Sequence, residues 1–395
     1  MTFPIGTVVK VTKSSNGKYQ ALLPDGRDVT DQFENYQLRN AVKKNCALKL
    51  TGTNAGTSQW RSVAMAEFTE HAKAAVPDVN EDVGHDTILD FLRGAAAVRP
   101  STYKMDDLKW RFAVRTVLRG KNMMIVGPRG CGKTVLAFTL ADVLDRELFN
   151  IPLGATQDPR SVLIGNTHFR ANEGTYVVQS EFVRAIQTKN AIVLLDEITR
   201  AHPDAWNILM PVLDYKQRFL RIDEDPNIPT IEVAEGVTFI ATANIGAQYT
   251  ATRTLDAALL DRFITIEIDP LDKEREMELL QSRFPQVPTS IRSAIVNIAV
   301  EVRKEAKNTD PRLSDIISTR ATLEMAELIF DGFSLIEASE LVIFPQFSEA
   351  GGTDSERSYV RQIVQKHLPT NLDDKQSPYE MDKDADQDLP WDPNP

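Results

Sequence analysis

The sequence predicts an α/β fold: a parallel sheet covered by helices, preceded by a small β-rich domain and followed by a helical domain. From about residue 103, short apolar runs such as NMMIVG (122–127) and AIVLLDE (191–197) alternate with helix-length segments. Continuous apolar strands between helices are typical of a parallel sheet that is buried on both faces. Residues 1–70 instead alternate apolar and polar positions, and the chain after Pro270 has a helical pattern.

The composition is that of a folded protein with several domains. The chain has 395 residues, of which 42% are hydrophobic and 26% are charged. This is enough apolar material for a sizeable core, and it excludes a chain that is disordered throughout. A chain of this length is expected to contain two or three domains.

Membrane, export and metal-binding signals are lacking. No apolar stretch is long enough for a membrane span, and the start MTFPIGTVVKVT lacks the features of a signal peptide. We therefore expect a cytoplasmic protein that does not contact a membrane. The two cysteines, Cys46 and Cys131, exclude a disulfide framework, and the five histidines show no zinc-ligand spacing.

Pattern and charge divide the chain into five predicted segments. We expect a β-barrel-like domain in 1–70, a linker in 71–100, an α/β domain in 101–270, a helical domain in 271–350 and a disordered acidic tail in 351–395. Residues 371–395 hold 2 basic and 8 acidic residues, which is −6 of the total net charge of −11. Because such a composition does not support a core, we expect the tail after residue 351 to be dispensable for activity.

The N-terminal region is basic, with 10 Lys and Arg against 6 Asp and Glu in residues 1–75. Its short strands predict a small barrel that resembles an OB or SH3-like fold. Two interpretations stay open: a nucleic-acid-binding face, or a solvated adaptor domain that is only mildly basic. The lysines concerned are Lys10, Lys13, Lys18, Lys43, Lys44 and Lys49.

A phosphate-binding loop is predicted at residues 127–134, GPRGCGKT, which match the pattern G-x-x-x-x-G-K-[ST]. The motif follows an apolar strand and opens a helix, so backbone N–H groups and the helix N-terminus would face the phosphates. Lys133 would neutralise the β and γ phosphates of ATP, and the Thr134 hydroxyl would hold Mg²⁺. The predicted nucleotide-binding residues are Gly127, Pro128, Arg129, Gly130, Cys131, Gly132, Lys133 and Thr134.

Two carboxylates are predicted at the carboxyl edge of the same sheet. Asp196 and Glu197 end the apolar run IVLLDE, and ligands of open α/β sheets bind at this edge. Asp196 would hold Mg²⁺, directly or through water, and Glu197 would deprotonate the attacking water. The run alone is a weak signal, but its place about sixty residues after the loop is usual in hydrolytic P-loop ATPases.

Two further polar residues are candidates for catalysis. Asn244 ends the predicted strand FIATAN. It could bind the attacking water together with Glu197, or it only caps a turn. Arg262 precedes the predicted strand FITIEID and could supply charge to the transferred phosphoryl group. Its alternative role is an ion pair with Asp261 or Asp256 that only holds the fold.

Together these residues resemble the AAA+ ATPases, and within them the MoxR-type, helix-2-insert group that includes the MoxR, CbbQ, NorQ and CobS-like proteins. The stretch DEITRAHPDAWNILMPVLDYKQ (196–217) looks like that group's DEINRA region, and ATAN with LDAALLDRF resembles its sensor-1 and arginine-finger pair. ISTRATLEMAELI (317–329) resembles the start of the lid helix with sensor 2, which would be Arg320. The resemblance covers about residues 100–345 and implies an AAA+ sheet with a helical lid domain.

The resemblance implies ATP and Mg²⁺ as cofactors and a homo-oligomeric ring, commonly a hexamer. In such a ring Arg262 would reach the nucleotide of a neighbouring subunit, and Arg320 would reach the nucleotide of its own. Arg253 is a candidate for a second finger, and the sequence does not rank the two.

Two insertions strengthen the resemblance. Residues 161–186 and 218–236 can each form a hairpin, and in the family such hairpins face the pore of the ring. The first departs from the family pattern, because Ser180, Glu181 and Phe182 stand where Gly-Pro-Leu is usual. This departure makes the local turn there an open question.

Three functions are compatible with these features. The resemblance implies a chaperone-like ATPase that remodels or matures a protein client, often with a von Willebrand A-domain partner. The alternative is a motor that acts on DNA or RNA through the basic N-terminal domain. Residues 218–236 hold 5 acidic residues against 2 arginines, which disfavours a phosphate-tracking pore. The third is a nucleotide switch without hydrolysis, which the intact Lys133, Asp196, Glu197 and Arg262 disfavour.

Overall fold

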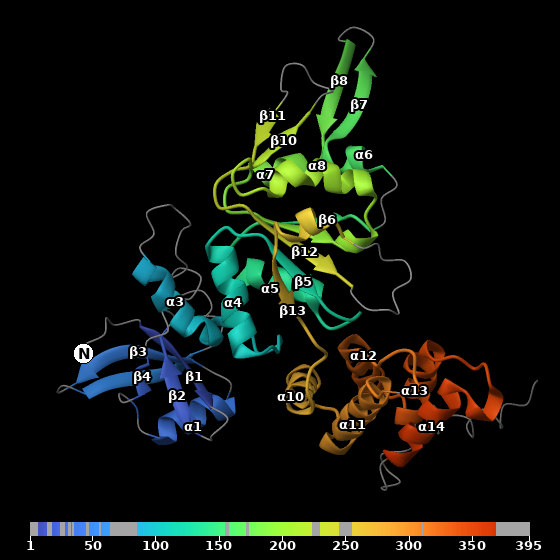
Figure 1. Ribbon diagram of the computed structural model, residues 1–395. Helices are drawn as coiled ribbons and strands as arrows, with labels where there is room; N and C mark the ends of the chain where they lie inside the picture. Colours follow the sequence, from blue (N-terminus) through green and yellow to red (C-terminus); the bar gives the residue numbers. More distant parts are fainter. Residues whose placement is uncertain are drawn as a thin grey trace, which may run out of the picture.

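The computed structural model contains an antiparallel N-terminal sheet, a central parallel sheet covered by helices, and a C-terminal group of helices (Figure 1). It confirms the predicted fold class. No helix in the described part of the chain has the length and apolarity needed to cross a membrane. The structure describes residues 7–13, 18–23, 28–30, 33, 35–44, 47–54, 57–63, 85–154, 158–170, 174–222, 230–244, 255–309 and 311–368.

The N-terminal sheet has four antiparallel strands in the order β2-β1-β3-β4. Val9 and Val11 of the first strand pack with Leu38 and Ala41 of a helix in a small core. The described strands form an open sheet with β2 and β4 at its edges, and they do not close into the barrel that we expected. The elements are β1 (Val8–Lys13), β2 (Tyr19–Leu22), α1 (Asn35–Lys44), β3 (Ala47–Asn54) and β4 (Thr57–Val63).

The predicted linker at 71–100 is wrong from residue 85 onward, where helix α3 (His85–Val98) begins. Ile88, Phe91 and Ala95 recur at helical spacing and are buried against α4 (Asp107–Leu118). A short helix needs such a packing partner to be stable, and the alanines and charges of the segment hid its period. Residues 71–84 lie outside the described residues.

The N-terminal sheet packs directly on α3 and α4. Val8 of β1 and Ala47 of β3 belong to the same hydrophobic cluster as the buried faces of these helices. The Lys10 ammonium donates hydrogen bonds to the carbonyl oxygens of Ala97 and Arg99, where α3 ends. Burial, reinforced by nearby positive charges, lowers the pKa of Lys10 to about 8. Lys10 is therefore engaged within the chain and is not presented to a partner.

The central sheet has five parallel strands in the order β13-β5-β12-β9-β6. Four of them, β5, β9, β12 and β13, lie at the apolar runs NMMIVG, AIVLLDE, FIATAN and FITIEID, as predicted. Strand β5 is buried along its whole length, with Met123 and Ile125 in the core on one face and Met124 and Val126 in the core on the other. The strands are β5 (Met123–Val126), β6 (Leu148–Pro152), β9 (Ile192–Asp196), β12 (Thr238–Ala243) and β13 (Ile264–Glu267).

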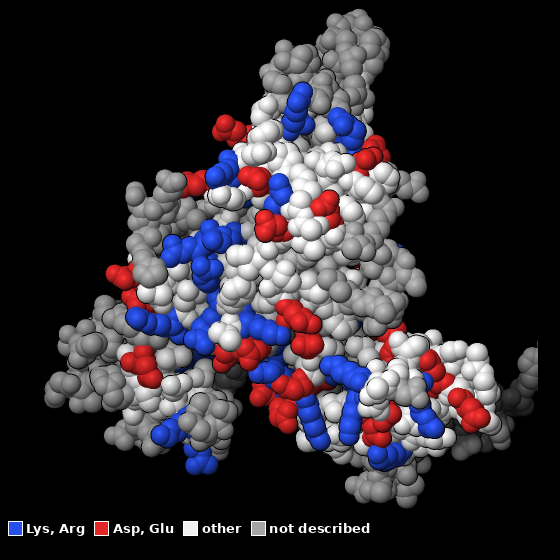
Figure 2. All heavy atoms as spheres, in the orientation of Figure 1, with Lys and Arg blue, Asp and Glu red and all other residues white. Residues whose placement is uncertain are grey.

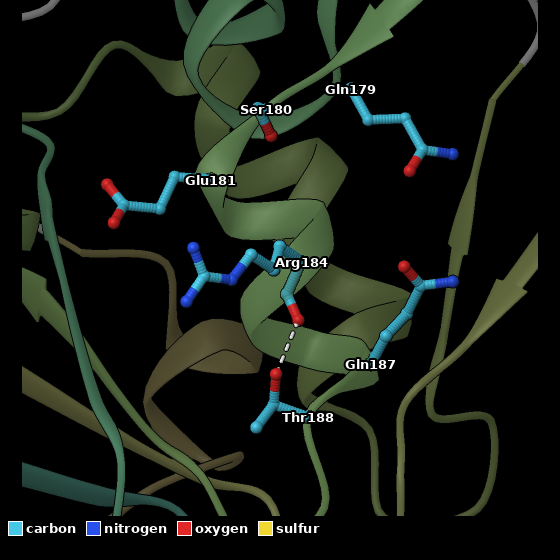
Figure 3. Close-up of a pocket in the computed structure, with 6 residues that line it drawn as sticks. All are labelled: Gln179, Ser180, Glu181, Arg184, Gln187 and Thr188. Atoms are coloured by element: carbon cyan, nitrogen blue, oxygen red, sulfur yellow. Dashed lines mark hydrogen bonds between the residues drawn. The ribbon is translucent and has the colours of Figure 1, made fainter.

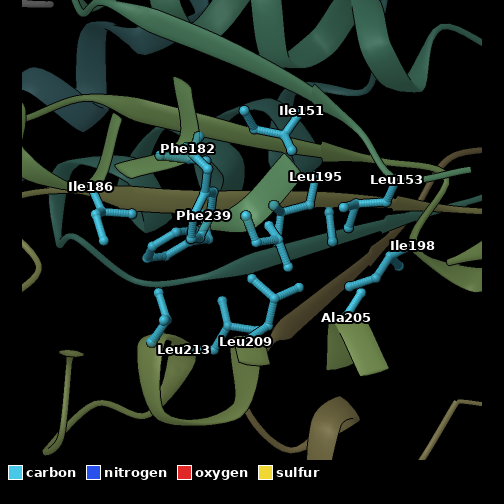
Figure 4. Packing of buried hydrophobic residues seen from close by; sticks show 14 of the residues in the cluster. Ile151, Leu153, Phe182, Ile186, Leu195, Ile198, Ala205, Leu209, Leu213 and Phe239 are labelled. Atoms are coloured by element: carbon cyan, nitrogen blue, oxygen red, sulfur yellow. The ribbon is translucent and has the colours of Figure 1, made fainter. Parts of the chain in front are cut away.

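Helices cover both faces of this sheet. Helices α4 and α5 (Lys133–Val143) pack on one face, and α7 (Glu181–Gln187) and α8 (Pro203–Leu213) pack on the other. Figure 4 shows the second layer, in which Phe182 and Ile186 of α7 and Leu209 of α8 surround Leu195 and Phe239 of the sheet. Three short elements complete it, namely α6 (Pro159–Leu163), the 3-10 helix η2 (Ile198–Arg200) and α9 (Ala257–Leu260).

Two hairpins extend from the layer of α7 and α8 in the same direction (Figure 1). Strands β7 (Gly165–Arg170) and β8 (Gly174–Gln179) lie between α6 and α7, and β10 (Phe219–Arg221) and β11 (Thr230–Glu232) lie between α8 and β12. Both predicted hairpins are confirmed. Their connecting residues, 171–173 and 223–229, lie outside the described residues.

The helical domain after Pro270 extends further than predicted. The boundary at residue 350 is wrong, because Val360, Ile363 and Val364 of a last helix are buried in the core of this domain. The strongly acidic residues after 371, which lie outside the described residues, dominated the composition and hid this amphipathic helix. The elements are α10 (Lys273–Arg283), α11 (Thr289–Ala306), α12 (Thr319–Phe330), α13 (Leu335–Val342), η3 (Phe344–Gln346), η4 (Gly352–Asp354) and α14 (Glu356–Lys366).

Truncating a buried side chain of α14 should destabilise the helical domain. We expect Ile363→Ala to lower the free energy of unfolding by about 2–5 kcal/mol, because it leaves a cavity among tightly packed side chains. The matched control is Gln362→Ala at the neighbouring exposed position, which should change the stability by less than about 0.5 kcal/mol. Equal stability of the two variants in urea unfolding would show that α14 does not belong to the core.

Candidate functional site

The phosphate loop joins the buried strand β5 to α5, and two of its positions have room only for glycine. A Cβ atom on Gly127 would lie 2.1 Å from the carbonyl oxygen of Ile268, which follows β13. A Cβ atom on Gly130, whose φ is +66°, would lie 2.6 Å from Oγ of Ser318 at the start of α12. The loop is therefore enclosed between the sheet and the helical domain.

Lys133 is turned inward beneath this loop. Its ammonium donates hydrogen bonds to the carbonyl oxygens of Gly127 at 2.9 Å and Pro128 at 2.6 Å, and to Oδ1 of Asn244 at 2.7 Å. Burial lowers the pKa of Lys133, and neighbouring acidic groups, among them Asp196, oppose the shift. The structure thus brings together two predicted site residues, Lys133 at the start of α5 and Asn244 just after β12.

Two hydroxyls converge on the Asp196 carboxylate. The Thr134 hydroxyl donates to Oδ1 of Asp196 at 3.3 Å, and the Thr242 hydroxyl donates to the same oxygen at 2.5 Å. A hydroxyl beside a carboxylate fits Mg²⁺, which takes few protein oxygens and completes its shell with water and phosphate. Within the described ranges no group of three or more His, Cys, Asp or Glu could hold a metal on its own. A Mg²⁺ ion here would take its remaining ligands from water and phosphate oxygens.

Glu197 has an unusual backbone conformation at the end of β9. Its φ of 56° and ψ of 44° are left-handed, which is sparsely populated outside glycine and recurs at functional sites. The Glu197 N–H donates to Oγ1 of Thr242 at 2.9 Å, and its carboxylate lies 3.0 Å from Nη1 of Arg200. A Cβ atom on Gly154, just past β6, would lie 2.5 Å from Oε2 of Glu197. These contacts set the direction of the Glu197 side chain.

Arg262 contacts α8 rather than the phosphate-loop residues. Its Nε donates to the carbonyl oxygen of Met210 at 3.1 Å, and Nη1 donates to that of Ala258 at 2.6 Å. Its Nη2 lies 3.5 Å from Asp214, which replaces Asp261 and Asp256 as the nearby carboxylate. The pKa of Asp214 is lowered by the backbone N–H groups of its own turn and, to a lesser extent, by Arg262. The candidate second finger, Arg253, lies outside the described residues.

The start of α12 lies against the phosphate loop. The N–H of Arg320 donates to the carbonyl oxygen of Gly130 at 3.3 Å, and Arg129 and Asp315 form an ion pair at 2.5 Å. A cavity of about 530 Å³ between loop and lid is lined by residues that include Arg129, Gly130, Ser318 and Arg320. Lys133, Thr134 and Asp196 do not line this cavity, which adjoins the phosphate loop on its lid side.

A second cavity, of about 650 Å³, lies on the side of α7 and is lined by polar and charged residues (Figure 3). Its lining residues come from the end of β8 and from α7, and they do not include the phosphate loop. Here Ser180 caps α7 by accepting the Val183 N–H at 3.2 Å, and Phe182 is fully buried. The departure from Gly-Pro-Leu is thus accommodated by a standard helix cap and an apolar anchor.

The sheet order, the phosphate loop, the acidic end of β9 and a helical domain lying against the loop define the class of protein. They are the parts of an AAA+ nucleotide-binding module. Two family profiles agree with this conclusion: the AAA domain of the dynein-related subfamily matches residues 122–263, and the CbbQ/NirQ/NorQ C-terminal domain matches residues 276–365.

Curated proteins similar to this chain agree with both profiles. BssE of Thauera aromatica, named as a candidate chaperone, is 34% identical over 218 residues, which is 55% of this chain and 72% of BssE. An uncharacterised protein of Staphylococcus epidermidis is 28% identical over 211 residues, covering 53% of this chain and 78% of that protein. One of Staphylococcus saprophyticus is 26% identical over 212 residues, with the same two shares. The chain belongs to the CbbQ/NirQ/NorQ type of AAA+ ATPases within the MoxR-type group.

Sequence reasoning missed Thr242, Arg200 and Gly154. Thr242 had a detectable signal, because it precedes Asn244 by two residues and therefore lies on the same face of the strand. The register pairs Ala241 with Leu195, which places Thr242 beside Asp196. Arg200 and Gly154 carry no comparable signal, since their contacts with Glu197 depend on a turn and a strand end that meet only in the fold.

Removing the Thr242 hydroxyl should weaken Mg²⁺-dependent nucleotide binding. Thr242→Val leaves the Asp196 carboxylate and the Glu197 N–H without this partner, so we expect about tenfold weaker Mg²⁺ affinity, whereas Thr242→Ser should stay near wild type. Magnesium titrations monitored with a fluorescent ATP analogue give the values. Thr238→Val is the matched control, because it removes a buried hydroxyl from the start of the same strand. Unchanged Mg²⁺ affinity in Thr242→Val would contradict the role of this hydroxyl.

Proposed function

We propose that this chain is a ring-forming, Mg²⁺-dependent ATPase that remodels or matures a protein client. The observation that carries the proposal is the meeting of Lys133, Thr134, Asp196, Glu197 and Asn244 at one edge of the parallel sheet. These side chains supply a positive charge, metal ligands, a base and a polar group for the attacking water. Hydrolysis of a phosphoanhydride needs this combination.

The contacts suggest how the site works. Loop N–H groups and the start of α5 would bind the phosphates, and the Lys133 ammonium would exchange the carbonyl oxygens of Gly127 and Pro128 for phosphate oxygens. Thr134 and Asp196 would hold Mg²⁺, which neutralises phosphate charge when bound. Asn244 would orient the attacking water, which Glu197 would deprotonate.

Glu197 must be available to that water, and its contact with Arg200 permits this. Both side chains of the ion pair are about half exposed. Such pairs contribute little stability in water and exchange easily. Binding of nucleotide and water therefore needs only a small rearrangement at Glu197.

A protein client is supported by two features. The name of BssE describes a candidate chaperone, and the hairpins β7–β8 and β10–β11 extend together from one side of the module (Figure 1). We propose that these hairpins face the pore of a hexameric ring in the cytoplasm and contact the client there. A von Willebrand A-domain protein is the partner that we propose for client delivery.

A nucleic-acid motor is the second candidate function. The basic surface that supports it is not the N-terminal one that we expected. The Lys10 ammonium is bound to carbonyl oxygens at the end of α3, whereas Figure 2 shows Lys and Arg side chains gathered over the region where α4 lies in Figure 1. Helix α4 and the turn after it carry the exposed cations Arg111, Arg119 and Lys121. ATPase rates with single-stranded DNA, duplex DNA and a co-purified protein partner separate the two functions. Stimulation by DNA that Arg111→Gln abolishes would favour the motor.

Two substitutions should separate binding from turnover. Lys133→Ala removes the charge that holds the phosphates, so we expect nucleotide binding to be lost. Glu197→Gln keeps shape and binding but removes the base, so we expect turnover to fall at least about a hundredfold. Binding assays and phosphate-release rates measure both effects. Hydrolysis at the wild-type rate in Glu197→Gln would contradict its assignment as the base.

The proposed ring places Arg262 at the nucleotide of a neighbouring subunit. Arg262→Ala and Lys133→Ala subunits should each be inactive alone, and mixing them should restore partial activity, because some interfaces combine both intact residues. Co-assembly is checked first with differently tagged subunits. No recovery in mixed rings would contradict action in trans, and near wild-type activity of Arg262→Ala alone would exclude a catalytic role.

A further inference from the structure

A buried ion pair in the helical domain contacts the turn of α12 that carries Arg320. Arg303 of α11 and Glu276 of α10 have side chains that are 8% and 0% exposed. Both guanidinium Nη atoms donate to the carboxylate, Nη2 to Oε1 at 2.9 Å and Nη1 to Oε2. This two-point arrangement fixes the relative orientation of the two side chains as well as their distance.

The remaining donors of Arg303 bind two backbone carbonyls outside its own helix. Its Nη1 donates to Leu271 at 3.1 Å, and its Nε donates to Ile317 at 2.7 Å. Leu271 lies where the chain passes from the α/β domain into α10, and Ile317 immediately precedes Ser318, the cap of α12. One guanidinium thus connects the domain crossing to the start of α12.

Glu276 also contacts the first turn of α12. Its Oε1 accepts a hydrogen bond from the Thr322 hydroxyl at 2.8 Å. The residues held by the pair, Ile317 and Thr322, lie on either side of Arg320 in the sequence. The backbone N–H of Arg320 donates to the carbonyl oxygen of Gly130 in the phosphate loop. The buried pair and the phosphate loop thus both contact the first turn of α12.

Stability alone does not account for such a pair. Desolvation offsets much of the attraction between buried charges, and apolar residues of similar volume often stabilise a core as well or better. An apolar pair, however, could not bind the carbonyls of Leu271 and Ile317. What the charged pair adds is a directional link between the domain crossing and the turn that carries Arg320.

We propose that Arg303 and Glu276 are positioning residues for Arg320, and that they couple its contact with the γ phosphate to the angle between the α/β domain and the lid. This inference rests on the proposed function, in which Arg320 reaches the γ phosphate of its own subunit. A residue that acts through Arg320 affects ATP, which has a γ phosphate, more than ADP, which lacks one. A residue that only holds the lid together lowers thermal stability without changing this preference.

The test compares the affinities for ATP and ADP of the full chain, with Glu197→Gln in every variant so that ATP persists. We expect Arg303→Lys to lower the preference for ATP over ADP about three- to tenfold, because lysine cannot make the bidentate contact and also bind Ile317. Glu276→Gln should shift the preference in the same direction and provides a second, milder variant if the first folds poorly.

Arg292→Lys is the matched control. Arg292 is also a buried arginine of α11, but its hydrogen bonds go to residues between 281 and 289, among them the carbonyls of Phe284 and Pro285, and not to α12. It should lower the melting temperature of the lid as Arg303→Lys does and leave the preference for ATP unchanged. Equal loss of preference in both variants would overturn the proposal, as would an unchanged preference in Arg303→Lys and Glu276→Gln.

Variants made in an Arg320→Ala background distinguish a failure of the coupling from a failure of the proposed nucleotide contact. If Arg303 acts through Arg320, Arg303→Lys should have no further effect on the preference in this background. A full additional effect there would overturn the proposal and leave the ATPase assignment intact. An unchanged preference in Arg320→Ala alone would refute the γ-phosphate contact and the coupling with it, whereas lost binding in Lys133→Ala still supports the nucleotide site.

Discussion

The close packing of the phosphate loop between the sheet and the lid is the constraint on which the rest of the molecule depends. Gly127 touches the carbonyl that follows β13, and Gly130 touches the first residues of α12, with no space for a side chain at either point. Neither surface can therefore move far without moving the loop. A nucleotide bound in the loop would contact both domains, which gives a physical basis for coupling the lid to the state of the nucleotide.

The polar groups beneath the loop form a connected hydrogen-bond network, in which one acceptor oxygen can bind more than one donor. Asp196 accepts from two hydroxyls, Thr242 links Asp196 to the backbone of Glu197, and Asn244 holds Lys133. The left-handed conformation of Glu197 concentrates backbone strain at the predicted base. Such a set responds as a unit, since moving one member changes the partners of the others.

The outer parts of the chain are tied to this module more closely than an adaptor or a tail would be. The N-terminal sheet shares a hydrophobic cluster with α3 and α4, and Lys10 caps the end of α3. Helix α14 completes the core of the lid. In the buried ion pair of the lid, Arg303 makes the link between the domain crossing and α12. Packed side chains and hydrogen bonds thus join these described regions to the module.

The parallel sheet, the phosphate loop and the acidic end of β9 could be predicted from the sequence, because each depends on local spacing and hydrophobic period. Asn244 could be proposed from sequence since parallel strands end at a common edge. Tertiary structure alone decided that α3 and α14 are core helices, because each is stable only against a partner surface. It also decided that Arg262 contacts Asp214 and that Gly154 and Arg200 direct Glu197. Such contacts join residues from separate elements, and no local pattern specifies how distant backbones approach each other.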